Sequence, residues 1–264
     1  MRWLVRFGYD GAGFSGWARQ PGLRTVEGEI LAHVVRQGVA ETARDAHLEV
    51  ASRTDRWVSA RANALAVSTA RSGPALLRCL NGIAPDIFCT AAAPISESFR
   101  VRGAVQRIYR YYEPGDATTA RQWRETSRLF RGPIDVRSFG RGLRRDTPVI
   151  RTVNAVEVTE VPGGLVVELR APSFVWGMVR KIVGALREVS RGRLTEARLR
   201  AAIDGRDLLT LPLAEPERLV LCSVEYPIPW TVTWPGPNRH QAARGVSQRD
   251  GLWARHEVLG ALRA

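Results

Sequence analysis

The chain has 264 residues and a formal net charge of +13 at pH 7, from 39 Lys and Arg against 26 Asp and Glu. This length predicts one large domain or two small ones, and a chain of this size needs no metal or disulfide to stabilise its core. No apolar run approaches the roughly 20 residues of a membrane helix, and the three cysteines form no Cys-x-x-Cys pair. We therefore exclude a membrane-spanning protein, a zinc cage and a disulfide framework, and expect a reducing, cytoplasmic location.

The excess of cations points to a polyanionic partner. All of these cations except one are Arg. A GC-rich genome would favour Arg over Lys, but it would not raise the number of cations above the number of anions. The planar guanidinium binds two phosphate oxygens at once, so the composition favours a nucleic acid as the partner.

Hydrophobic patterns predict strands and helices in the N-terminal half. Residues 2–7 alternate as a strand does, and a Gly-rich loop follows them. Thr25 can cap the next helix, because it precedes a segment with one apolar face and acidic residues in its first turn. Further strands are predicted at 48–52 and 63–69, and a short helix at 74–80. Prolines and small residues at 85–98 predict a boundary between an N-terminal domain, 1–95, and a C-terminal domain, 96–264.

The C-terminal half continues the alternation of strands and helices. The predicted elements are a strand at 99–113, a helix at 119–130, a hairpin at 153–170 that turns at Pro162-Gly163-Gly164, and helices at 173–190 and 195–203 capped by Ser173 and Thr195. Alternating elements with antiparallel hairpins are typical of an α+β fold, here with two similar lobes. A basic tail with weak periodicity follows residue 234.

Arg180 stands out because its segment, SFVWGMVRKIVGALREV, is apolar almost all round. Gly177 and Gly184 lie on the same helical face as Arg180, so another backbone can approach closely there. A buried guanidinium needs a carboxylate, because an isolated charge in the interior costs several kcal/mol. The pattern fits a structural ion pair within the C-terminal half as well as a functional pair.

Asp55 is the most conspicuous candidate for a catalytic carboxylate. It lies between Arg53 and Arg56 in the segment SRTDRW, just after a predicted strand. Positive neighbours keep a carboxylate ionised, and an ionised, positioned Asp suits nucleophilic or general-base chemistry. The alternative is an Asp that caps a turn in a surface loop.

Arginine and tyrosine interleave in the segment RIYRYYE at 107–113. This combination holds backbone phosphates and stacks unpaired bases in RNA-binding proteins. The surrounding stretch 100–151 contains 13 Arg against 5 acidic residues. The alternative is a half-buried strand whose tyrosines lie in the core and whose arginines are solvated.

Several segments together resemble one family, the TruA class of tRNA pseudouridine synthases. They are, in chain order, GYDGAGFSGWARQPGLRTVEGEI, SRTDRWVSA, FRVRGAVQRIYRYY, SFVWGMVRKIVGAL and AEPERLV, within about residues 4–227. The resemblance implies the pseudouridine synthase α+β fold, with two α/β lobes around a central antiparallel sheet and the active-site cleft between the lobes. It also implies a homodimer that isomerises uridine to pseudouridine on the 3′ side of the anticodon stem-loop of tRNA, without cofactor or metal.

The resemblance also assigns roles to individual residues. Asp55 matches the catalytic Asp, and Arg180 matches the Arg that pairs with it. Tyr109 matches the Tyr that packs against the target base and assists proton removal. Arg53 matches a substrate-binding Arg, and Leu219 an apolar wall of the uracil pocket. Whether Asp55 attacks the sugar at carbon 1′ or removes the 2′ proton stays open.

Several residues depart from the pattern of the family. Bacterial members have Gly-Arg-Thr-Asp-Ala-Gly-Val-His-Ala where this chain has SRTDRWVSA. Ser59 in place of the His and the basic Arg56 after Asp55 are nearer the archaeal and eukaryotic style, but Trp57 in place of the Gly is unusual in either. Because Trp does not readily adopt a positive φ, the loop after Asp55 is expected to have a different shape. Trp57 is also a candidate substrate-binding residue that stacks on RNA. Arg218 replaces another usual Gly.

Two further functions compete with the enzyme. A catalytically silent tRNA-binding or tRNA-folding protein on the same scaffold predicts damage to the catalytic set, yet all four matching residues are present: Arg53, Asp55, Tyr109 and Arg180. A DNA-binding regulator would need a helix-turn-helix or zinc signature, which this sequence lacks.

Overall fold

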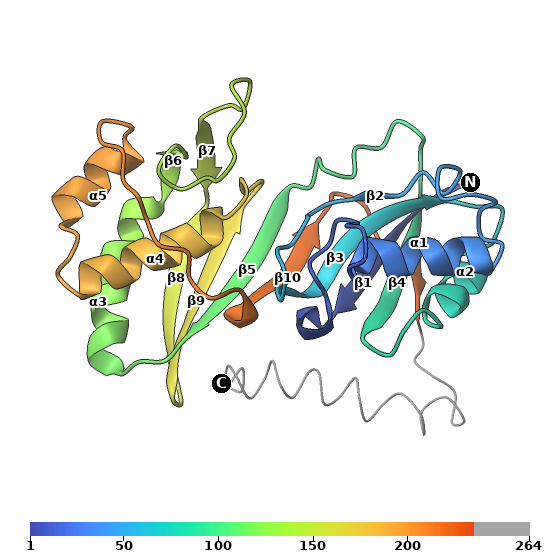
Figure 1. Cartoon of the computed structure of the whole chain (residues 1–264), viewed down its shortest axis with the longest axis horizontal. Coiled ribbons are helices and arrows are strands. Elements are labelled where there is room, and N and C mark those ends of the chain that lie inside the picture. Colours follow the sequence, from blue (N-terminus) through green and yellow to red (C-terminus); the bar gives the residue numbers. More distant parts are fainter. Residues whose placement is uncertain (235–264) are drawn as a thin grey trace. The chain divides into compact units, whose positions relative to one another are not determined.

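The computed structural model describes residues 1–234, and the described chain divides into two compact units (Figure 1). The first unit contains residues 1–105 and 221–234, and the second contains 106–220. Both units combine antiparallel strands with helices, which confirms the predicted α+β class. The division differs from the one expected after residue 95, since the chain returns to the first unit after Val220. The predicted basic tail lies outside the described residues.

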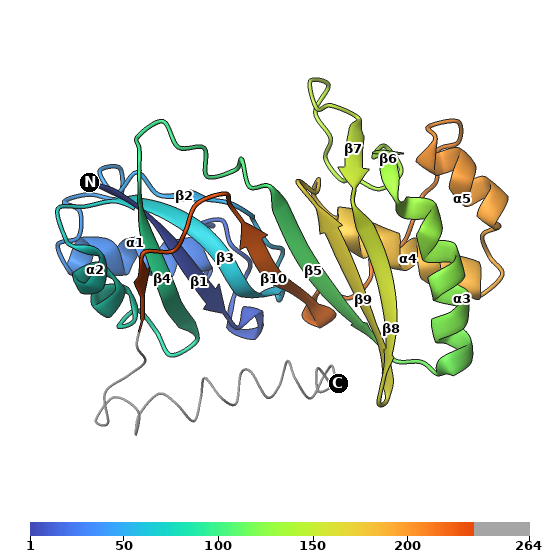
Figure 2. The ribbon, with the colours of Figure 1, turned by 180° about the vertical axis from the view of Figure 1, so that it is seen from behind.

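The first unit is built on the strands β1, β3 and β4. β1 (Arg2–Tyr9) lies between β3 (Ser59–Ser68) and β4 (Ile87–Ile95), antiparallel to both. Nearly every residue of β1 is buried, and helices α1 and α2 cover one face of this sheet (Figures 1 and 2). The shorter elements of this unit are β2 (Glu49–Val50), η1 (Gly11–Gly13), α1 (Val26–Arg36), α2 (Gly73–Leu80) and β11 (Val232–Thr233).

The second unit contains the predicted hairpin. β8 (Ala155–Val161) and β9 (Gly164–Ala171) pair around a turn at Pro162 and Gly163, and β9 also pairs with β5 (Gln106–Glu113). Helix α4 crosses one face of β8 and β9 (Figures 1 and 2). The remaining elements are α3 (Ala117–Ser127), η2 (Arg128–Phe130), β6 (Gly132–Asp135), β7 (Ile150–Val153), α4 (Met178–Ser190), α5 (Glu196–Ile203) and η3 (Pro216–Arg218). β10 (Leu219–Glu225) begins in this unit and ends in the first.

Helix starts that depend on a local side chain were predicted correctly. The Thr25 hydroxyl accepts a hydrogen bond from Gly28 N at 3.2 Å, and the Thr195 hydroxyl accepts one from Arg198 N at 3.3 Å. The start of α4 was wrong by five residues: Gly177 has φ +78° and precedes the first helical residue, and Ser173 caps nothing there.

Two strand predictions also need correction. Residues 85–98, where a boundary was predicted, lie within the first unit, because β4 occupies most of this segment and pairs with β1. The strand predicted at 99–113 begins only at Gln106, since the chain turns twice before it, through bonds from Phe99 N to Ser96 O and from Gly103 N to Arg100 O.

None of the helices within residues 1–234 has both the length and the apolar character that crossing a membrane requires. In the same residues, no three His, Cys, Asp or Glu side chains are grouped in a way that could hold a metal ion.

Candidate active site

Asp55 lies in the loop between β2 and β3, and backbone bonds hold the residues around it. Trp17 N donates to the carbonyl of Thr54 at 3.1 Å, and Val58 N donates to the carbonyl of Asp55 at 3.2 Å, which closes a turn. The hydroxyl groups of Tyr9 and Thr54 are hydrogen-bonded at 2.7 Å. The Asp55 side chain is half-buried. Asp55 is thus fixed in position and partly enclosed. A reacting carboxylate must be held in place, so this arrangement suits catalysis better than a mobile position on the surface would.

Glycines of the opening segment allow this loop to pack closely. A Cβ added at Gly11 would lie 2.4 Å from the carbonyl carbon of Val58, a distance that real side chains do not tolerate. Gly16 has φ +95°, and a Cβ there would lie 3.1 Å from the carbonyl oxygen of Thr54. The Gly-rich loop therefore supports the Asp55 segment by direct contact between backbones. We had not predicted this role, although the glycine spacing in GYDGAGFSGW was a signal for it.

Trp57 adopts a backbone conformation that a Trp was expected to avoid. It has φ +67°, the left-handed conformation that a glycine adopts easily. For a residue with a side chain this conformation costs about 1–2 kcal/mol. Trp57 is 37% exposed, and the guanidinium carbon of Arg56 lies 4.2 Å from the centre of its ring. Arg53 is exposed on the same loop. The structure therefore brings Arg53, Asp55 and Trp57 together in the first unit.

Tyr109 lies in β5 of the second unit and is 7% exposed. Its ring meets the ring of Phe174 edge-on, with 5.3 Å between the centroids. The arginines of the same strand have partners within the protein: Arg107 is buried and donates to a backbone carbonyl, and Arg110, which is 31% exposed, pairs with Glu168 at 2.6 Å. The tyrosines are thus core residues, as the alternative stated, but the arginines of this strand are engaged inside the protein.

Arg180 lies in the first turn of α4 and is half-buried. Its Nε donates to the carbonyl of Ala214 at 2.6 Å, and Ala214 N donates back to the carbonyl of Arg180 at 3.1 Å. A Cβ added at Gly184 would lie 2.1 Å from the carbonyl oxygen of Pro212. This contact confirms the prediction that a glycine near Arg180 lets another backbone approach.

Leu219 follows η3 and is 5% exposed. The adjacent Arg218, which replaces a usual Gly, places Nη1 at 3.6 Å from the Glu113 carboxylate. Tyr109, Arg180 and Leu219 therefore belong to three different elements of the second unit.

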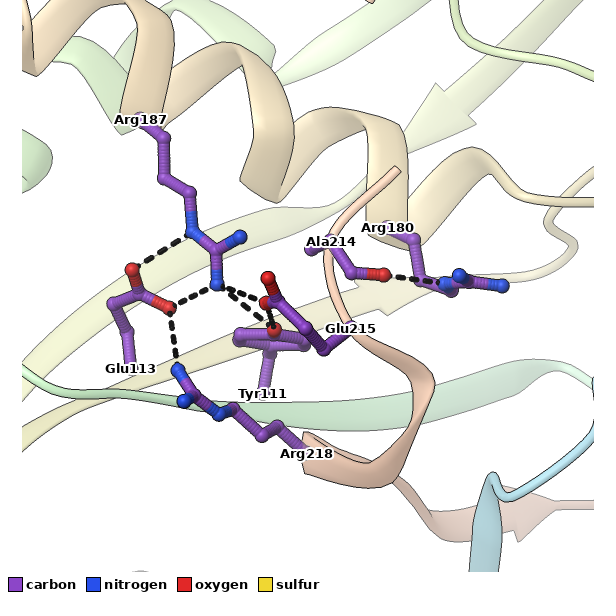
Figure 3. A network of polar contacts seen from close by, with 7 residues as sticks. All are labelled: Tyr111, Glu113, Arg180, Arg187, Ala214, Glu215 and Arg218. Atoms are coloured by element: carbon purple, nitrogen blue, oxygen red, sulfur yellow. Dashed lines mark hydrogen bonds and ion pairs between the residues drawn. The ribbon is translucent and has the colours of Figure 1, made fainter. Parts of the chain in front are cut away.

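An ion-pair network near these elements was not predicted. We define the Arg187 cluster as Arg187, Glu113, Glu215, Tyr111 and Arg218 (Figure 3). Arg187 Nε donates to Glu113 at 2.7 Å, and Arg187 Nη2 donates to Glu215 at 2.5 Å and to the Tyr111 hydroxyl at 3.0 Å. The Tyr111 hydroxyl donates to Glu215 at 2.8 Å. The only sequence signal was that Arg187 follows Arg180 by seven residues, two turns along one helical face.

The cluster shifts the titration of its members. The hydrogen bond from Arg187 lowers the pKa of Glu215 to about 2, and the bond from Tyr111 acts in the same direction. Burial raises the pKa of the Tyr111 hydroxyl. Glu215 is therefore an anion and Tyr111 a neutral donor near neutral pH, which is the state that their hydrogen bonds require.

Comparisons with known proteins agree with the resemblance. Residues 127–227 match the family model described as tRNA pseudouridine synthase. The tRNA pseudouridine synthase A of Thermococcus onnurineus is 38% identical over 229 residues, which is 86% of this chain and 85% of that protein. The chain belongs to the tRNA pseudouridine synthase A family. The member from Pyrococcus furiosus is also 38% identical, over 86% of this chain and 84% of its own. The member from Methanothermobacter thermautotrophicus is 32% identical, over 84% and 80%.

Members of this family isomerise uridine to pseudouridine, so the chain is an isomerase of the pseudouridine synthase class. Membership also confirms the pseudouridine synthase α+β fold that the sequence predicted. Among solved structures, a chain of a Cbf5-Nop10-Gar1 complex aligns with 68% of this chain and 52% of its own, at 16% identity and a TM-score of 0.30. That similarity is too low to support an argument about this enzyme.

Proposed function

We propose that this enzyme isomerises uridines on the 3′ side of the anticodon stem-loop of tRNA, as a cytoplasmic homodimer, with Asp55 as the catalytic carboxylate. The observation that carries the proposal is the Asp55 loop, in which Asp55 is half-buried and hydrogen bonds hold the backbone next to it. Family membership supports tRNA as the substrate. The stem-loop, the homodimer and the location rest on the resemblance to the TruA class.

The reaction breaks the glycosidic bond from carbon 1′ of the ribose to nitrogen 1 of uracil and forms a bond from carbon 1′ to carbon 5. In one route the Asp55 carboxylate attacks carbon 1′ and the uracil leaves as an anion. In the other route Asp55 removes the 2′ proton and the base leaves by elimination. After the base turns, carbon 5 bonds to carbon 1′. In the first route this step breaks the bond between Asp55 and carbon 1′ and releases the carboxylate, and in the second route Asp55 returns its proton to carbon 2′. The proton on carbon 5 then passes to Tyr109 or Asp55, and nitrogen 1 is protonated. No net oxidation occurs, and no cofactor is required.

Each of the other proposed site residues has a distinct role. Arg180 keeps the catalytic carboxylate ionised, because a guanidinium favours the charged form of an Asp. Tyr109, stiffened by Phe174, packs against the detached base. Leu219 forms an apolar wall of the uracil pocket, and Arg53 binds the substrate. Trp57 stacks on RNA.

Exposed arginines of the second half support the binding of a polyanion. Ten of the 13 arginines in 100–151 are exposed; the other three are Arg107, Arg110 and Arg151. Phosphate contacts from such side chains supply affinity that falls steeply as salt rises. The target base must leave its stack to reach an enclosed carboxylate, so we propose base flipping.

The test is tritium release from tRNA transcripts labelled at carbon 5 of uridine. We expect release by the wild type and none by Asp55→Asn, with tRNA binding retained in both. Asp45→Asn is the matched control, because Asp45 lies on another exposed loop of the same unit and caps a turn at Thr42; it should keep full activity. Equal release by wild type and Asp55→Asn would place the catalytic carboxylate elsewhere.

Two further outcomes would overturn parts of the proposal. No release by the wild type despite tight tRNA binding would favour the catalytically silent RNA-binding protein. Mapping pseudouridine in the product tells whether the stem-loop assignment is correct: we expect it on the 3′ side of the anticodon stem-loop, and modification only at other positions would refute that assignment.

A further inference from the structure

The Arg187 cluster connects three elements of the second unit. Arg187 itself lies on α4, Glu113 ends β5, and Glu215 lies just before η3. Of the proposed site residues, Tyr109 also lies on β5 and Arg180 on α4, and Leu219 directly follows η3. Figure 3 shows Arg180 beside the cluster. We propose that Arg187 is a positioning residue for the isomerisation: it fixes the segment 214–218 against α4 and thereby orients the guanidinium of Arg180. This inference rests on the proposed role of Arg180.

The connection from Arg187 to Arg180 is short and continuous. Glu215 accepts hydrogen bonds from Arg187 and Tyr111, and it directly follows Ala214 in the chain. The Ala214 carbonyl is the acceptor for Arg180 Nε at 2.6 Å. Figure 3 shows this bond beside the cluster, with the terminal nitrogens of Arg180 directed away from it. Because hydrogen bonds weaken steeply with misalignment, a shift of the 214–215 peptide would reorient the Arg180 side chain.

The charges of the cluster make Arg187 difficult to replace. The Arg187 side chain is 13% exposed and that of Glu113 is 11% exposed, so both charges are largely removed from water. Without Arg187, the one cation within residues 1–234 that would still pair with the Glu113 carboxylate is Arg218, at 3.6 Å. A guanidinium can bind two carboxylates and a hydroxyl from one rigid plane, whereas the ammonium group of Lys is a point charge on a flexible chain. Arg187→Lys should therefore restore the charge but only part of the geometry.

If Arg187 only stabilised the fold, its loss would lower stability without lowering kcat. A matched control variant separates this structural role from the positioning role. Asp135, at the end of β6, forms an ion pair with Arg137 at 2.8 Å, and its side chain is 6% exposed. The Asp135 carboxylate is as enclosed as that of Glu113, although Arg137 is 46% exposed. The pair lies in the same unit, but it involves none of the three elements that carry site residues. Asp135→Asn should therefore lower stability without lowering kcat.

The experiment compares Arg187→Met, Arg187→Lys and Asp135→Asn by tritium release, at a temperature at which circular dichroism shows each variant folded. We expect Arg187→Met to lose about 10- to 100-fold in kcat, the effect of a small misplacement of a reacting group. KM for tRNA should stay within about three-fold, because the cluster contacts no RNA in the proposal. Arg187→Lys should lie between wild type and Arg187→Met, and all three variants should have a lower Tm.

A kcat of Arg187→Met within about two-fold of wild type, with Tm lowered as in Asp135→Asn, would overturn the positioning role. If Arg187→Met does not fold, Arg187→Lys and Glu215→Gln replace it in the test. Both variants should lower kcat by a larger factor than that by which they change KM, and an unchanged kcat in both would refute the inference. Failure of the proposed function is a separate result, since it would show as equal release by wild type and Asp55→Asn.

Discussion

Trp57 allows the cost of a backbone conformation to be separated from the contribution of a side chain. Trp57→Gly and Trp57→Ala both remove the ring and its contact with Arg56, but only Gly adopts φ +67° without strain. The left-handed conformation costs Ala about 1–2 kcal/mol. Against this, Gly loses about 0.5–1 kcal/mol more conformational entropy on folding. We therefore expect Trp57→Gly to be more stable than Trp57→Ala by about 1 kcal/mol.

Thermal unfolding followed by circular dichroism measures this difference. For a protein of this size, about 1 kcal/mol corresponds to a Tm difference of about 2–4 °C. A Trp57→Ala variant as stable as Trp57→Gly would show that the loop does not hold a positive φ there. The same two variants test the proposed stacking on RNA, because losing one base stack should weaken tRNA binding by about 1–3 kcal/mol in both. Unchanged tRNA affinity in both folded variants would refute the stacking role.

Two further predictions concern the second unit. Gly184→Ala should lower the free energy of unfolding by about 1–3 kcal/mol, because the new methyl group would overlap the Pro212 carbonyl; an unchanged urea midpoint would contradict this contact. The ionised Glu215 carboxylate should contribute fully to stability at pH values above its unfolded pKa of about 4.3. This contribution should be lost as the pH falls toward its folded pKa of about 2. Wild type should therefore lose stability more steeply than Arg187→Met between these two pH values, and parallel pH profiles would show that the pair does not form.

Local signals in the sequence explain which elements could be predicted. The caps at Thr25 and Thr195 act within three residues, and the hairpin turn depends on Pro162 and Gly163 alone. β4 was missed because Pro94 and small residues suggested a boundary between domains. In the structure β11 pairs with Ala91 and Ala92, before Pro94 is reached, so the missing N–H of the proline breaks none of these bonds.

The candidate site was predictable only where its chemistry lies in contiguous motifs. Asp55 and Arg53 stand in one such motif, and Arg180 was conspicuous as a charge within an apolar helix. The Arg187 cluster could not be predicted in the same way, because Arg187 pairs with Glu113 across 74 residues and with Glu215 across 28. Periodicity shows which face of a helix is apolar, but it does not show which distant carboxylate meets an arginine on that face.

Two departures from the family pattern, Arg218 and Trp57, differ in how the structure accommodates them. Arg218 is compensated electrostatically, because the Arg187 cluster offers it the Glu113 carboxylate. Trp57 keeps a strained backbone although more than a third of its surface stays exposed, so burial recovers little of the cost. Strained residues persist mainly where function requires their position. An exposed aromatic ring held two residues after the proposed catalytic Asp55 is therefore better explained by contact with RNA than by packing, and this is why the Gly and Ala variants should differ in stability but not in tRNA affinity.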